Sequence, residues 1–179
     1  MTELKVEMGQ KLEIALPARA FGQALLVGQT GSIKVRTPGA PGYVDITGEA
    51  VQFIQETGIS FGILTVFSKH TTAAIVIQEK ESMLLRDMTL FLEGLAPREA
   101  YYHHNDFEIR TENLTPDESP NGHAHCQHLL LGSSQVIPIV AGQLALGRWQ
   151  RIFLVELDTP RDREVLFQVL GLQVGLAGG

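Results

Sequence analysis

The chain lacks the sequence features that mark secreted and membrane-spanning proteins. Its 179 residues include one cysteine, which excludes a disulfide within the chain and favours a reducing compartment. No apolar run approaches the roughly 18 residues that a membrane-spanning helix needs. Met1–Glu7 alternates charged with apolar residues and does not form the apolar core of a signal peptide. These absences predict a cytoplasmic protein that does not associate with membranes.

The chain also lacks an excess of positive charge. It has 20 acidic residues against 14 lysines and arginines, so the formal net charge is −6. Nucleic acids are polyanions, and proteins bind them largely by neutralising phosphates with lysine and arginine. A general attraction to nucleic acid is therefore excluded, and no nucleic-acid partner is predicted.

The first 31 residues show no continuous pattern. Leu4–Met8 and Leu12–Leu16 alternate apolar with polar residues, as edge strands do, but Pro17 and several glycines interrupt the alternation. We predict that residues 1–31 form an N-terminal extension. Residues 32–179 are predicted to form one domain, because a chain of this length can bury a sizeable core.

Apolar and alternating runs predict most of the strands. Phe61–Phe67 and Ala73–Ile77 are rich in apolar and β-branched residues, as buried strands are. The link between them is too short for a crossover helix, so the two strands are predicted to be antiparallel. Further strands are predicted at Ser32–Thr37, Gln135–Val140, Gln143–Leu146, Arg151–Leu157 and Val165–Leu170.

Helical spacing of apolar residues predicts the helices. In Glu81–Leu95, the apolar residues form one face and most charged residues lie on the other. Residues 48–57 are predicted to begin after an N-cap at Thr47 and to stop at Gly58, and His123–Leu131 ends before a glycine. Strands with short links and few helices predict an α+β fold with antiparallel sheet.

Chemically reactive side chains are densest in Asn121–Ser134. This segment holds three of the six histidines and the one cysteine. If this segment is a helix, one face carries Asn121, His125 and His128, and a different face carries His123 and Cys126. The helix alone therefore does not form a site, and His125 is the main candidate for a ligand or catalytic role. A nucleophilic cysteine would need a base on its own face, and a small core residue is its commoner role.

Histidines elsewhere complete a metal site in one interpretation. His70 follows a predicted buried strand, a place where rigid elements fix a side chain, and His103 and His104 lie in a polar segment. His70, one of that pair and His125 would give a divalent metal such as zinc or nickel three nitrogen ligands and an open position. In the alternative interpretation, the histidines belong to an exposed polar helix and hold no ion.

Hydroxyl groups suggest a phosphate site. Thr71, Thr72, Ser133 and Ser134 can hold phosphate oxygens through their hydroxyl and backbone N–H groups. The same residue types also occur at ordinary turns and helix ends.

Other polar segments lie between the predicted strands. Trp149 and Gln150 can contact a flat ring, although a place in the core is the commoner role of a tryptophan. Arg161–Arg163 is interpreted as a solvated turn. Phe107–Gly122 carries prolines and acids and is predicted to be a long surface loop, a length that is usually functional or disordered.

Three motifs follow one another along the chain: His-Thr-Thr-Ala-Ala at His70–Ala74, the helix around His125 that ends in Leu-Leu-Gly-Ser-Ser134, and Gly-Gln-Leu-Ala-Leu-Gly-Arg-Trp-Gln at Gly142–Gln150. Together they resemble the YjbQ family over Ile33–Gly171. The resemblance implies an α+β fold, in which mostly antiparallel strands form a β-sandwich flanked by a few helices. It also implies a homotrimer with polar sites near the subunit contacts.

The resemblance implies an activity for which alternatives stay open. Some members of the family are assigned as thiamine-phosphate synthases, transferases that join a pyrimidine diphosphate to a thiazole phosphate. A divalent metal, magnesium among the candidates, or hydroxyl groups would stabilise the leaving phosphates. One alternative is a trimer that binds a metal or an anion without that activity. Another is an interaction protein whose polar groups line a trimer channel.

The resemblance also assigns site residues, by their positions in the family's motifs. The family's motif positions are matched by His70, Asn105, His125, Ser133, Ser134, Trp149 and Gln150. We expect His70, His125 and Asn105 to act in catalysis. The chain departs from the family at His123, where many members have an acidic residue, so a magnesium-binding role does not carry over to that position. It also departs at Phe107–Pro120, an insertion that is expected to reshape the entrance of the site.

Overall fold

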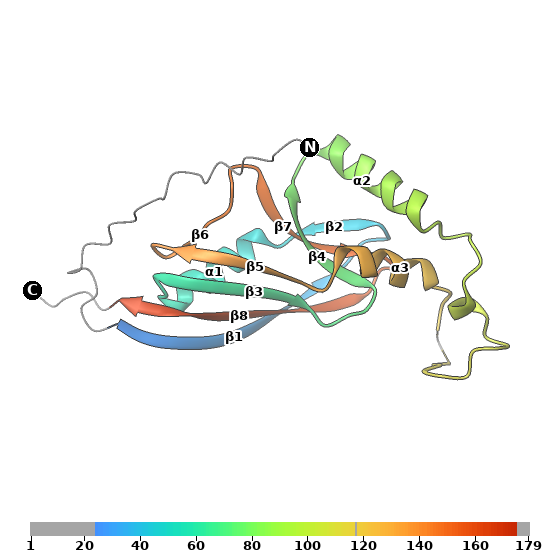
Figure 1. Ribbon diagram of the computed structural model, residues 1–179, viewed down its shortest axis with the longest axis horizontal. Helices are drawn as coiled ribbons and strands as arrows, with labels where there is room; N and C mark the ends of the chain where they lie inside the picture. Colours follow the sequence, from blue (N-terminus) through green and yellow to red (C-terminus); the bar gives the residue numbers. More distant parts are fainter. Residues whose placement is uncertain (1–23, 117, 175–179) are drawn as a thin grey trace, which may run out of the picture.

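A computed structural model of the protein describes residues 24–116 and 118–174 (Figure 1). Two antiparallel sheets form the centre of this part of the chain, with strand orders β1-β8-β3-β5-β6 and β2-β7-β4. Helices α1, α2 and α3 accompany them. The predicted α+β fold with antiparallel strands and a few helices is confirmed. No helix among the described residues is long and apolar enough to cross a membrane.

The larger sheet is built on a long pair of strands, β1 and β8, which pair over their whole length from Ala24↔Val174 to Arg36↔Asp162. The first strand therefore begins before the predicted start at Ser32. At Gly31 a Cβ would lie 2.8 Å from the ring of Phe53, so any larger residue there would require that ring to shift. The remaining part of the predicted extension, residues 1–23, lies outside the described residues. The strands of this sheet are β1 Ala24–Arg36, β8 Asp162–Val174, β3 Phe61–Ser68, β5 Ser134–Val140 and β6 Gln143–Leu144.

The smaller sheet has β7 in its middle. Its strands are β2 Gly42–Asp45, β7 Gln150–Glu156 and β4 Ala73–Glu79. The prediction that Phe61–Phe67 and Ala73–Ile77 form an antiparallel pair was wrong, because β3 pairs with β5 and β8 whereas β4 pairs with β7. The short link between them carries the chain from one sheet to the other. That crossing places His70 and its neighbours at the junction of the two sheets.

Two apolar clusters hold the layers together. In β7, Ile152 and Leu154 pack into the cluster between the sheets, while Phe153 and Val155 pack into a second cluster on the other face. This alternation is the period of two expected for a strand with both faces buried. Helix α1, Thr47–Thr57, contributes to the first cluster. Helices α2, Ser82–Leu95, and α3, Gly122–Leu131, contribute to the second.

The start of α1 differs from the prediction in one respect. Thr47 is the first helical residue and not the N-cap. Asp45 Oδ1 accepts hydrogen bonds from the Thr47 backbone N–H at 3.0 Å and from the Thr47 hydroxyl at 2.7 Å. Burial would raise the pKa of Asp45, but the bonds from Thr47, Lys80 and Arg151 outweigh it and lower the pKa to about 2. Gly58 ends the helix in the left-handed conformation, φ +66°, as predicted.

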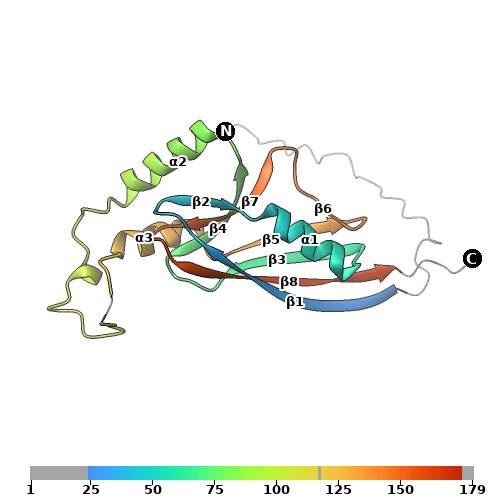
Figure 2. The same cartoon turned by 180° about the vertical axis from the view of Figure 1, so that it is seen from behind.

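Helix α2 has the predicted apolar face, but this chain covers little of it. On that face Leu92 is buried, whereas Phe91 and Leu95 are exposed. Figures 1 and 2 show the helix running away from the two sheets at one end of the molecule. An exposed apolar face of this kind is uncommon on a single subunit.

Candidate functional site

A polar pocket of about 500 Å³ lies where several elements meet: the link between β3 and β4, the start of β8, the start of α3 and the loop before it. The pocket is rich in cations and imidazoles. Its lining includes Lys69, His70, Thr71, Thr72, His104, Arg110, Glu118, Asn121, His125, Arg161 and Arg163. The structure therefore brings together five residues predicted for the site: His70, Thr71, Thr72, His104 and His125.

His70 is held by the backbone of the neighbouring strand. The Glu164 N–H donates to His70 Nε2 at 2.8 Å, so the neutral ring carries its hydrogen on Nδ1. Burial lowers the pKa of His70, and the positive charge of Arg163 lowers it further. The ring is therefore fixed in one tautomer, with its Nε2 lone pair already in use.

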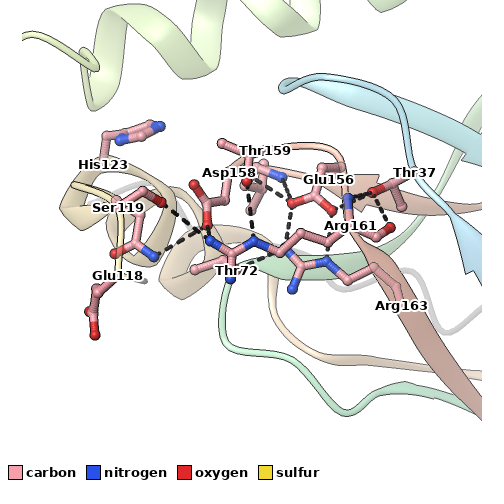
Figure 3. Close-up of polar contacts among 12 residues, drawn as sticks. Thr37, Thr72, Glu118, Ser119, His123, Glu156, Asp158, Thr159, Arg161 and Arg163 are labelled. Carbon is pink, nitrogen blue, oxygen red and sulfur yellow. Dashed lines mark hydrogen bonds and ion pairs between the residues drawn. The ribbon is translucent and has the colours of Figure 1, made fainter. Parts of the chain in front are cut away.

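A buried ion pair forms the base of the site. Arg163 donates to both carboxylate oxygens of Glu156, with Nε to Oε2 at 2.7 Å, and its Nη2 also donates to the Thr72 hydroxyl at 3.0 Å (Figure 3). The Thr37 hydroxyl lies 2.6 Å from Glu156 Oε2. Burial would raise the pKa of Glu156, but the hydrogen bonds from Arg163 and Thr37 outweigh it and lower the pKa. This network fixes Thr72 at the wall of the pocket.

The interpretation of Arg161–Arg163 as a solvated turn was wrong. Arg163 is 5% exposed and belongs to β8, and both arginines line the pocket. The signal was present in the alternation, because Arg163 shares the inward face of the strand with Val165 and Phe167. A charged residue in register with core residues normally has a buried partner, which here is Glu156.

Arg161 pairs with a second buried carboxylate. Its Nη2 lies 2.7 Å from Asp158 Oδ2, and the Asn121 amide nitrogen donates to the same oxygen at 3.3 Å. The Arg161 side chain is 42% exposed, whereas Asp158 is 1% exposed. Figure 3 shows the guanidinium between Asp158 and Ser119. The positive group thus faces the solvent, and its counter-ion lies behind it.

The inserted loop forms one wall of the pocket. Arg110 Nη1 lies 2.5 Å from Glu118 Oε1, and the guanidinium also donates to the carbonyls of His104, Glu112 and Asn113. The hydrogen bond from Arg110 lowers the pKa of Glu118. The described part of the loop at residues 107–122 is therefore organised around one arginine, and Arg110 and Glu118 line the pocket.

His104 and His125 are in contact. Their ring centroids are 4.5 Å apart with the planes at 68°. Burial lowers the pKa of His125, and the neighbouring His104 lowers it further. Two protonated imidazoles this close would repel each other, so simultaneous protonation of both rings is unfavourable unless an anion enters the pocket.

Several predicted site residues lie elsewhere in this chain. Asn105 Oδ1 accepts the Gly122 N–H at 2.8 Å and so caps the start of α3, in the 3₁₀ turn His103–Asn105. The ring of His103 contacts Tyr101. The other predicted residues outside the pocket lining are Ser133, Ser134, Trp149 and Gln150.

Trp149 and Cys126 do not take the core positions that are common for these residue types. Trp149 is exposed, with the Arg148 guanidinium 4.6 Å from its ring, so it is not a core tryptophan. Cys126 is also exposed and is not a core residue. Ser133 lies at the far end of α3, where its hydroxyl is 3.2 Å from His128 Nε2.

The metal prediction has limited support in this arrangement. Among the described residues, no three side chains of His, Cys, Asp or Glu lie close enough together to hold an ion. His70 Nε2 already accepts a hydrogen bond, so that nitrogen is not free to ligate. The side chains of this pocket do not fit a resident metal, and a metal at this site stays a prediction.

The fold and the pocket define an α+β protein with two antiparallel sheets and a cationic, histidine-lined site. The chain belongs to the YjbQ family: the family model described as "UPF0047 protein YjbQ-like" matches residues 31–172. A UPF0047 protein of Methanothermobacter thermautotrophicus is 39% identical over 142 residues, which cover 79% of this chain and 92% of that one.

Solved structures agree with this membership. A YbjQ-like protein of unknown function from Sulfolobus solfataricus P2 superposes with a TM-score of 0.74 at 34% identity, covering 82% of this chain and 99% of that one. A hypothetical protein from Aeropyrum pernix K1 gives a TM-score of 0.71 at 36% identity, with 80% and 98% covered. The family membership is thus shown, and its function is unknown.

Proposed function

We propose that the pocket binds a small phosphorylated molecule and that the protein is a transferase that forms thiamine phosphate. The observation that carries the first part is the arrangement of the cations. Lys69, which pairs with Glu164 at 3.2 Å, and Arg161 both present exposed positive groups to the pocket, and the carboxylate of Asp158 is buried behind Arg161. Because the guanidinium of Arg161 faces the pocket and its counter-ion Asp158 lies behind it, an anion can approach the positive group. An arginine also recognises phosphate oxygens well.

The neighbouring groups suit a phosphate as well. Thr71 is exposed at the pocket and offers a hydroxyl, while the Thr72 hydroxyl is held by Arg163. His104 and His125 gain positive charge when protonated, and an anion beside them would favour that state. The pocket volume of about 500 Å³ is within the range of small-molecule sites.

The transferase part rests on the family resemblance. In that reaction, the bond between carbon and diphosphate oxygen breaks, and the electron pair leaves with pyrophosphate. A lone pair of the thiazole nitrogen then forms the new bond to carbon. The chain's contribution would be to stabilise the leaving phosphates through Lys69, Arg161 and the Thr71 hydroxyl.

Purified protein incubated with the pyrimidine diphosphate and the thiazole phosphate tests the activity. The proposal expects thiamine phosphate to form at a rate above the protein-free reaction, with and without added divalent metal. Lys69→Met should reduce that rate. No product under any metal condition would refute the transferase proposal and favour the alternative, an anion- or metal-binding protein without that activity.

We also propose that the protein is a homotrimer. Two separate apolar surfaces support this assembly. The outer sheet face carries the exposed residues Leu26, Ile63, Phe67, Val136, Val140 and Leu170. The groove between α2 and α3 is lined by the exposed residues Phe91, Leu95 and Leu130. Figures 1 and 2 show α2 and the pair β1–β8 on different sides of the molecule. In a closed ring, each subunit uses two different surfaces, whereas a symmetric dimer uses one. Two apolar patches therefore agree better with a trimer than with a dimer.

A further inference from the structure

The two ring nitrogens of His70 have different surroundings. Nε2 accepts the Glu164 N–H at 2.8 Å, whereas Nδ1 has no hydrogen-bond partner within residues 24–116 and 118–174. The buried side-chain nitrogen and oxygen atoms that lack a partner in this part of the chain do not include His70 Nδ1, so this atom is open to solvent. The half-buried ring lines the pocket, and Nδ1 is therefore accessible to a ligand there.

The contact with Glu164 determines what Nδ1 can do. A backbone N–H only donates, so Nε2 must present its lone pair and cannot carry a hydrogen. The single N–H of the neutral ring therefore lies on Nδ1. Turning the ring over would place a carbon atom against the Glu164 N–H and leave that donor without an acceptor. Nδ1 is consequently a hydrogen-bond donor, and it has no lone pair to offer.

A donor at this position suits an anion and opposes a cation. Lys69, the next residue in the chain, and Arg161 line the same pocket and are donors as well. The oxygens of a deprotonated phosphate only accept, so each of the three groups can bind one of them. A metal ion would need a lone pair on His70, but one nitrogen is occupied by Glu164 and the other carries the hydrogen.

We propose that His70 is a phosphate-binding residue that donates from Nδ1 to an oxygen of the ligand without the help of a metal. The backbone N–H of Glu164 is the positioning group that holds the ring in the required tautomer. This inference rests on the proposed function, since it needs a phosphate in the pocket. It deepens that function by giving His70 one role, in place of metal ligation or proton abstraction.

Nitrogen-15 NMR of the histidine rings tests the inference on the wild-type protein, free and saturated with pyrophosphate, at a pH above the ordinary histidine pKa. We expect His70 to carry its hydrogen on Nδ1 in both states, and the Nδ1 resonance to shift when pyrophosphate binds. A hydrogen on Nε2, or saturable binding without a change at Nδ1, would overturn the inference and leave phosphate binding standing. If pyrophosphate does not bind saturably, the proposed phosphate site fails, and the inference fails with it.

Two amide substitutions separate the donor of His70 from its acceptor. Counted in bonds from Cα, the amide nitrogen of asparagine matches Nδ1 and the amide oxygen of glutamine matches Nε2. His70→Asn thus keeps the donor to the ligand, whereas His70→Gln keeps the acceptor for the Glu164 N–H.

Calorimetric titration of pyrophosphate into protein dialysed against a chelator measures the effect of each substitution. We expect His70→Gln and His70→Ala to weaken binding about tenfold, the effect of one hydrogen bond to a charged acceptor, and His70→Asn to stay within about threefold of the wild type. The inference is wrong if His70→Asn binds as weakly as His70→Ala, if His70→Gln binds as tightly as the wild type, or if dialysis abolishes binding to the wild type. If a variant does not fold, the NMR measurement still decides, because it needs no variant.

Discussion

At the scale of residues, buried histidines link the site to the pH of the solution. Burial lowers the pKa values of His70, His123, His125 and His128 below the model-peptide value of 6.5. For a histidine with a lowered pKa, the unfolded chain takes up the proton first as the pH falls. The neutral ring therefore makes its full contribution to the free energy of unfolding above about pH 6.5. That contribution is lost as the pH falls from there to the pKa of the histidine in the folded protein.

The free energy of unfolding should consequently decrease between about pH 7 and about pH 5. Urea unfolding followed by circular dichroism at a series of pH values measures it. The carboxylates with lowered pKa, such as Asp45 at about 2, lose their contribution at lower pH and do not account for this window. His125→Gln should make the decrease shallower, while His103→Gln, at an exposed ring, is the control. A stability that stays constant over this range would contradict the structure.

At the scale of elements, one buried ion pair joins β7 to β8. Glu156 is fully buried and its two oxygens are occupied by Arg163, so removal of the arginine leaves a buried charge without a partner. Arg163→Met is expected to lower the free energy of unfolding by about 3–5 kcal/mol. The exposed pair between Arg36 and Asp162 is the matched control, and Arg36→Met should cost less than about 1 kcal/mol. Similar small losses in both variants, measured by urea unfolding, would refute the role of this pair.

The start of α3 depends on a side chain from outside the helix. Asn105 Oδ1 accepts the Gly122 N–H, whereas Asn121 at the N-cap position makes no capping bond. Asn105→Ala should lower the free energy of unfolding by about 1 kcal/mol, and Asn105→Asp, which keeps the acceptor, should restore most of it. Thermal unfolding of the three proteins measures this. If Asn105→Ala is as stable as the wild type, the capping role is wrong and the predicted catalytic role gains support.

At the scale of the whole molecule, the exposed apolar surfaces predict how the protein assembles. Ile63 and Leu170 are cross-strand neighbours on the outer sheet face, and both are exposed. Ile63→Lys with Leu170→Lys places two charges in that surface and should convert a trimer into monomers, because a buried unpaired charge opposes association. Light scattering after gel filtration gives the mass, with Gln55→Lys on the exposed side of α1 as control. A trimer that persists in the double variant would exclude this face from the interface.

The sequence predicted local structure well and spatial arrangement less well. The apolar runs predicted β3 and β4, and helical spacing predicted α2, because these signals are local. Strand pairing was mistaken because a short link can also cross between two sheets. In the site, the motif histidines His70 and His125 do share a pocket. Arg161 and Arg163 were missed as site residues because Arg161–Arg163 resembles a solvated turn, although each arginine pairs with a buried carboxylate only a few residues before it, Asp158 and Glu156.

The pocket is proposed to bind a phosphorylated ligand through its exposed cations. Titration of pyrophosphate into the wild type, Lys69→Met and Lys80→Met measures this binding. Both lysines are exposed and paired with a carboxylate, but Lys80 follows the opposite end of β4, about 20 Å from Lys69. We predict saturable binding that Lys69→Met weakens about tenfold and Lys80→Met leaves unchanged. Absence of saturable binding, or equal weakening by both variants, would refute phosphate binding at this pocket.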